Sequence, residues 1–112
     1  MEDVLVNQAF ESAKRKGFAA DSWCVEASAA MVNYIRARGG SADARRYVLP
    51  NGDGHVTVVT PAGEFDPTIG CWAEPPKHSS CGQLYRVGGL SPHQGWVIDR
   101  QFQTRHILDM DI

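Results

Sequence analysis

The sequence predicts an α+β fold in which a central helix packs on a small antiparallel sheet. Apolar residues recur at helical spacing in two segments at the start of the chain, and short β-rich runs separated by turn residues begin at about Ala44. Helices followed by strands are typical of the α+β class. With 112 residues, 43% of them hydrophobic, the chain is expected to form one domain (1–112) with its own core.

The first helix is predicted from about Val4 to Lys16. Gly17 follows a basic last turn, which is typical of a helix end. The apolar residues that recur at helical spacing are Val4, Leu5, Ala9, Phe10 and Ala13. Residues 1–20 are therefore interpreted as an accessory N-terminal helix.

The second helix is predicted to follow a cap at Asp21 or Ser22 and to run to about Arg38, where Gly39 and Gly40 end it. Its apolar residues form one broad stripe, and its alanines allow a neighbouring element to approach closely. The stripe consists of Cys24, Val25, Ala29, Met31, Val32 and Ile35, with Ala27 and Ala30 beside it. We therefore expect this helix to be the central one.

The strands are predicted from β-rich runs between clusters of Gly, Pro and Asn. They are expected at Arg46–Leu49, His55–Thr60, Glu64–Asp66, Gln83–Val87 and Gly95–Asp99, with one more near Thr104–Leu108. A loop rich in Pro, Ser and Gly over 67–82 separates the third strand from the fourth.

The charge balance argues against nucleic-acid and membrane partners. The formal net charge is −2 and the pI about 6.0, and the longest basic run is Lys14-Arg15-Lys16. No apolar run approaches the roughly 18 residues of a membrane span. Acidic Glu2 and Asp3 stand where a secretory signal would be basic. We therefore expect a soluble domain with neither nucleic acid nor a membrane as partner.

Cys24 lies at the predicted start of the second helix, in the segment Asp21-Ser22-Trp23-Cys24. Free backbone N–H groups and the positive end of the helix dipole favour a thiolate there. The same N–H groups could stabilise the oxyanion that forms when a thiolate attacks a carbonyl. A cysteine in an alanine-rich helix is more often a small buried hydrophobic residue, so position alone does not establish a nucleophile.

His55 and Asp66 are the predicted partners of Cys24. His55 opens a valine-rich strand after a glycine-rich turn, where an imidazole can face a helix end. A hairpin centred between Thr60 and Pro61 would set His55 opposite Asp66, about 5 Å apart at Cβ, so that the carboxylate could orient the imidazole. A slip of one residue would turn Asp66 to the other face. Taken singly, each residue has an equally good alternative role: His55 as a surface histidine at the edge of a strand, and Asp66 as the first residue of a turn-forming Asp-Pro pair.

The order of these residues resembles that of a known group of enzymes. A Cys on a helix, a His opening a strand and an Asp in a Gly-x-x-Asp-Pro-Thr segment are similar to the papain-like and transglutaminase-like cysteine enzymes. The compact papain-fold toxin domains of bacterial polymorphic toxins and secreted effectors are especially similar. The resemblance covers about 21–68 as the catalytic core, with 69–112 as the remaining sheet and loops. It implies a papain-like fold with Cys24 as nucleophile, His55 as general base and acid, Asp66 as orienting residue, and no cofactor.

A second resemblance is to the NlpC-type cell-wall peptidases, through residues 54–59 and 21–24. Those enzymes normally carry a second polar residue, often His, on the following strand, where this chain has Asp66. The chain also departs from the papain pattern, because residues 18–23 contain no glutamine to complete the oxyanion hole. Asn7 or Gln8 could replace it only if the fold brings the first helix to Cys24.

The late cysteines and histidines suggest a zinc site only weakly. Cys71, His78, Cys81 and His93 offer four potential ligands, but Cys-x₆-His-x₂-Cys is not a standard zinc-finger spacing, and no metal is predicted. Cys71 and Cys81 are otherwise loop thiols, or a disulfide in an oxidising compartment.

Aromatic residues are the candidates for the cleft wall. Trp23 and Trp72 are predicted to bind substrate because of their proximity to Cys24 and to the strand of Asp66, although packing is the commoner role of a tryptophan. His93, Trp96 and Asp99 near a late strand form a second set, interpreted first as sheet and loop structure.

The leading hypothesis is cysteine-dependent acyl transfer at an amide bond of a protein or peptide substrate. Glutamine deamidation, peptide-bond cleavage and transamidation share the steps up to the acyl-enzyme. The resemblance to toxin domains implies a secreted or delivered effector with a cognate immunity protein as partner. The alternatives are an NlpC-like peptidoglycan amidase or endopeptidase, a non-catalytic papain-like module that binds a protein, and a zinc-stabilised adaptor.

Overall fold

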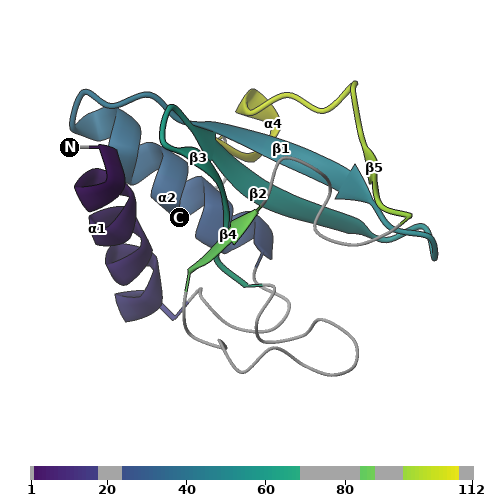
Figure 1. Ribbon diagram of the computed structural model, residues 1–112, viewed down its shortest axis with the longest axis horizontal. Coiled ribbons are helices and arrows are strands. Elements are labelled where there is room, and N and C mark those ends of the chain that lie inside the picture. The colour runs from purple at the N-terminus through teal and green to yellow at the C-terminus, as the bar shows by residue number, and fades with distance from the viewer. Residues whose placement is uncertain (1, 18–23, 69–83, 88–94, 109–112) are drawn as a thin grey trace.

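The computed structural model describes residues 2–17, 24–68, 84–87 and 95–108 (Figure 1). Its elements are α1 (Glu2–Arg15), α2 (Cys24–Ala37), β1 (Asp43–Val48), β2 (Gly54–Thr60), β3 (Gly63–Asp66), β4 (Tyr85–Val87), β5 (Val97–Ile98) and α4 (Arg105–Leu108). The strands form one antiparallel sheet in the order β4-β3-β2-β1-β5. The predicted α+β class with a small antiparallel sheet is confirmed.

Helix α2 is central, as predicted, because it contacts the sheet on one side and α1 on another (Figure 1). Seven of its 14 residues are buried, and three of these are alanines. Such small side chains allow α1 to pack closely against it. Both helices end where glycine was expected to end them, at Gly17 and Gly39, which have φ of 82° and 83°.

The apolar face of α1 differs by one position from the prediction. Val6, Ala9, Phe10 and Ala13 are buried, whereas Val4 is 59% exposed. The buried residues follow the spacing of three and four that one helix face requires, and Val4 lies outside it.

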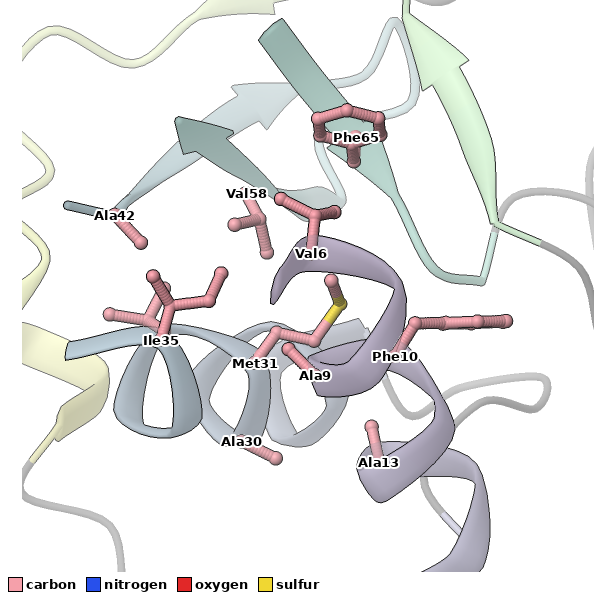
Figure 2. Packing of buried hydrophobic residues seen from close by; sticks show 11 residues of the cluster. Val6, Ala9, Phe10, Ala13, Ala30, Met31, Ile35, Ala42, Val58 and Phe65 are labelled. Carbon is pink, nitrogen blue, oxygen red and sulfur yellow. The ribbon is translucent and has the colours of Figure 1, made fainter. Parts of the chain in front are cut away.

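The main core lies between the two helices and the sheet. Figure 2 shows Met31 of α2 beside Val6 and Ala9 of α1, with Val58 of β2 and Phe65 of β3 above them. A second cluster joins Ala29, Val56 and Ile107. Burying a side chain of this size stabilises the fold by about 1.5–3 kcal/mol, so the two clusters fix α2 firmly against β2.

The segment near Thr104–Leu108 is helical, and the prediction of a strand there is wrong. His106 N donates to Gln103 O at 2.9 Å and Ile107 N to Thr104 O at 3.1 Å. Of the four residues of α4, only Ile107 is buried. A single helical turn is sufficient to direct this one side chain into the core.

The hairpin of β2 and β3 also has another register than predicted. Thr60 pairs with Gly63 and Val58 with Phe65, so Pro61 and Ala62 form the turn. The predicted centre would have placed Pro61 second in the turn, a position that disfavours proline, whereas the first position suits its fixed φ. The register moves by two residues, and Asp66 therefore stays on the predicted face.

Candidate functional site

Cys24 is the first residue of α2, is partly exposed and has a free thiol. The predicted cap at Asp21 or Ser22 lies outside the described residues. A thiol in the first turn faces the end of the helix where backbone N–H groups have no intrahelical acceptor. Cys24 is therefore both reachable from solvent and close to hydrogen-bond donors.

His55 and Asp66 form a buried pair at one end of the sheet. They are 1% and 0% exposed, and His55 Nε2 lies 2.5 Å from Asp66 Oδ2. The predicted partnership is therefore present, although Asp66 lies diagonally across from His55 rather than directly opposite. Continuing the pairing of Val58 with Phe65 by one residue sets Asp66 against Thr57, two positions along β2 from His55.

Asp66 also shapes the turn that follows it. Its Oδ1 accepts a hydrogen bond from Thr68 N at 3.1 Å, while Oδ2 faces the imidazole. The same carboxylate therefore contacts both the turn after β3 and the imidazole of His55. The backbone donor fixes the carboxylate plane and thereby the direction of its bond to His55.

The imidazole of His55 interacts with both Asp66 and Cys24. Burial lowers its pKa, but hydrogen bonds to the side chains of Asp66 and Cys24, and their charges, outweigh that effect and raise the pKa of His55 to about 9. At neutral pH this arrangement favours an imidazolium between a carboxylate and a sulfur.

Trp96 is a further part of this site. Its ring meets the His55 ring edge-on, with the centroids 5.3 Å apart, and also lies 6.3 Å from the ring of Tyr47. Tyr47 is the strand partner of His55. The sequence indicated only a secondary role for Trp96, because its place beside His55 depends on the pairing of β5 with β1. That pairing involves only two residues of β5, Val97 and Ile98, which are too few to predict it.

A carboxylate network lies beside the pair on the same face of the sheet. Glu64 accepts hydrogen bonds from Arg45 Nη1 at 2.8 Å, Tyr47 OH at 2.5 Å and Thr57 Oγ1 at 2.8 Å. Burial and the bond to Glu64 raise the pKa of Tyr47 to about 12. Sequence reasoning missed this network, which joins three strands around the base of the site.

Three other residues considered from the sequence, Asn7, Gln8 and Asp99, lie elsewhere. Asn7 and Gln8 line a surface groove with Tyr34, which is ten residues and so about 15 Å along α2 from Cys24. They do not complete an oxyanion hole. Asp99 binds Arg46 at 2.8 Å and accepts from Gln101 N at 3.0 Å, so it belongs to an ion pair and a turn.

The remaining candidates lie outside the described residues: Trp23, Trp72, Cys71, His78, Cys81 and His93. Within the described ranges, no three His, Cys, Asp or Glu side chains gather as a metal site. No helix in that part of the chain has the length and apolar character to cross a membrane.

Comparison with protein-family models, with curated proteins and with solved structures finds no match to this chain. The chemistry must therefore be inferred from the site itself.

Proposed function

We propose that this protein is a papain-like cysteine hydrolase that transfers acyl groups from amide bonds of a protein or peptide. The carrying observation is that one buried imidazole lies 2.5 Å from Asp66 Oδ2 through its Nε2 and also interacts with the side chain of Cys24, a partly exposed residue. Such an arrangement is the sulfur form of a nucleophile, base and orienting acid.

In the proposed reaction the Cys24 thiolate attacks the amide carbonyl and forms a C–S bond. The carbonyl electrons move to oxygen, and N–H groups at the start of α2 stabilise the resulting oxyanion. The C–N bond then breaks as the His55 imidazolium gives a proton to the leaving ammonia or amine. Neutral His55 next takes a proton from water, the hydroxide attacks the thioester, and the carboxylic acid leaves as the thiolate returns.

Asp66 serves this cycle by holding His55 in one orientation through both protonation states. Trp96 covers the side of the ring and limits its rotation. Of these three residues only Cys24 is partly exposed, since His55 and Asp66 are buried. This pattern is expected when the substrate approaches Cys24 from solvent and His55 transfers protons from the buried side of the site.

The substrate class that we propose is a glutamine side-chain amide or a peptide bond of a protein. An effector or toxin role, with a cognate immunity protein as partner, goes with this proposal and depends on the resemblance to toxin domains. The leaving group distinguishes the reactions, because ammonia marks deamidation and a new amino terminus marks cleavage.

The test compares the native protein with Cys24→Ala on a set of unfolded proteins and on a peptidoglycan digest. Deamidation adds about one mass unit and releases ammonia, whereas cleavage gives fragments. We expect a product that Cys24→Ala does not form and that the conservative Asp66→Asn forms at least about tenfold more slowly, because asparagine no longer stabilises the imidazolium. Equal products from native protein and Cys24→Ala would exclude Cys24 as the nucleophile, and turnover only of peptidoglycan would move the substrate class to the cell wall.

A further inference from the structure

Ser28 lies one helical turn behind Cys24, on the same side of α2. Its side chain is 0% exposed, and its hydroxyl donates to the backbone carbonyl of Val56 at 3.2 Å. Val56 is the residue after His55. One buried hydrogen bond therefore ties the helix that carries the sulfur to the strand that carries the imidazole.

The Val56 carbonyl points toward this hydroxyl because of the sheet's hydrogen-bond pattern. Arg46, the partner of Val56, uses its own carbonyl to accept from Asp99 N at 2.8 Å, on the side of β5. Two residues that lie opposite each other on antiparallel strands either exchange both backbone hydrogen bonds or exchange none. When they exchange none, the N–H and C=O groups of each residue point away from the other strand. Val56 therefore points its carbonyl away from β1, to the side where β3 runs.

Strand β3 cannot supply the donor that this carbonyl needs. Beyond the pair of Val58 and Phe65, the same register sets Val56 against Pro67, which has no N–H. Pro67 directly follows Asp66, where β3 ends. The site thus needs Asp66 as the last residue of the strand, and the proline after it leaves a buried acceptor that Ser28 satisfies.

We infer that Ser28 is a positioning residue, which holds the Cys24 helix and the His55 strand at the separation that keeps the sulfur and the imidazole hydrogen-bonded. This inference rests on the proposed function, since it assigns Ser28 to the same site. Without the hydroxyl, Val56 keeps an unsatisfied buried carbonyl, and α2 can move relative to β2. The sulfur and the ring then spend less time in contact.

The experiment measures alkylation of Cys24 by iodoacetamide between pH 5 and pH 9, with the Cys24 peptide quantified by mass spectrometry apart from those of Cys71 and Cys81. A thiolate held by an imidazolium reacts at low pH, whereas an isolated cysteine does not. We expect Cys24 of the native protein to label faster at pH 5.5 than Cys24 of His55→Ala, and this rate to fall about five- to tenfold in Ser28→Ala, the change given by one hydrogen bond of ordinary strength.

The matched control is Thr60→Val, which removes a buried hydroxyl that lies on β2 rather than on α2. Thr60 donates to Gly63 O at 3.1 Å in the turn at the other end of that strand from His55. The Thr60→Val variant is expected to have a lower unfolding midpoint and an unchanged pH profile of Cys24 alkylation. If Ser28→Ala does not fold, Ser28→Thr and Ser28→Val replace it, because they have the same shape and differ only in the hydroxyl.

The outcomes separate the two proposals. A native rate at pH 5.5 no higher than that of His55→Ala would overturn the proposed function, and the positioning role with it. A high native rate that Ser28→Ala retains, or that Thr60→Val loses equally, would overturn the positioning role alone.

Discussion

Single residues in this site hold more than one contact each. Asp66 uses one oxygen for the turn at Thr68 and the other for His55. His55 likewise contacts Asp66 through Nε2 and interacts with the side chain of Cys24. Each ring or carboxylate is thus fixed from two directions, which is what pre-organised catalytic groups require.

Trp96 gives a prediction at this scale. Its edge contact restrains the His55 ring, and aromatic contacts of this kind are worth about 0.5–1.5 kcal/mol. Trp96→Ala is therefore expected to lower kcat/KM roughly 2- to 10-fold, with Trp96→Phe retaining most of the native value. The measurement is steady-state kinetics on the substrate identified with native protein. An unchanged kcat/KM in Trp96→Ala would show that the ring does not restrain His55.

The sequence identified the residues of the site better than their supports. Cys24, His55 and Asp66 could be selected because each residue type has a known chemistry and a distinctive local context. Ser28 and Trp96 could not, since a serine in an alanine-rich helix and a tryptophan near a short strand carry no local signal. Their roles arise only when α2 packs on β2 and when β5 pairs with β1.

At the scale of elements, the hairpin shows how far sequence patterns reach. Alternation placed Asp66 on the correct face, because an error of two residues in register preserves the face. The turn decided the actual register, since Pro61 takes the first turn position. Pro67 then ends β3. The carbonyl of Val56 near the start of β2 is therefore hydrogen-bonded by Ser28 of α2 instead of by β3.

The Glu64 network provides a prediction for the sheet. Glu64 is 11% exposed at its side chain and accepts from three strand residues, so its removal leaves Arg45, Tyr47 and Thr57 without their acceptor. Glu64→Ala is expected to lower the free energy of unfolding by about 2–4 kcal/mol, and Tyr47→Phe by about 1–2 kcal/mol. Urea unfolding of both variants and of the double variant measures these values.

The double variant tests whether the two residues act together. Because Tyr47 OH binds Glu64 directly, the two losses should fall short of additivity by at least about 0.5 kcal/mol. Additive losses would mean that this hydrogen bond contributes nothing to stability. Glu11→Ala offers a control, since Glu11 pairs with Lys14 at 3.7 Å on the exposed surface of α1 and its loss should cost little.

For the whole molecule, composition and periodicity were sufficient to predict the class, the two long helices and most strands. They were insufficient at the C-terminal end, where the segment near Thr104–Leu108 is a helical turn rather than a strand. Short segments carry few periodic positions, so tertiary contacts decide their conformation. Thr104 shows this, because its hydroxyl accepts from Ala44 N at 3.0 Å and donates to Asp43 at the start of β1.

The pH dependence of stability is the last prediction and concerns the whole fold. The pKa of His55 is about 9 in the folded protein, against 6.5 for an ordinary histidine. Folding therefore strengthens proton binding, and the associated stability is fully present below pH 6.5 and is lost as the pH rises through 9. We expect the free energy of unfolding to fall by an amount of the order of 2–3 kcal/mol over this interval. Tyr47, with a pKa of about 12, does not titrate there.

Urea unfolding at pH 6, 7.5 and 9 measures this loss in the native protein and in Asp66→Asn. The asparagine keeps the shape but removes the charge beside the ring, so the pKa of the buried imidazole should fall and the pH dependence should flatten. Cys24→Ala should flatten it in part, because the sulfur also raises that pKa. Parallel curves for native protein and Asp66→Asn would mean that the charge of Asp66 does not govern the protonation of His55, and a stability that rises toward pH 9 would mean that folding favours the neutral ring.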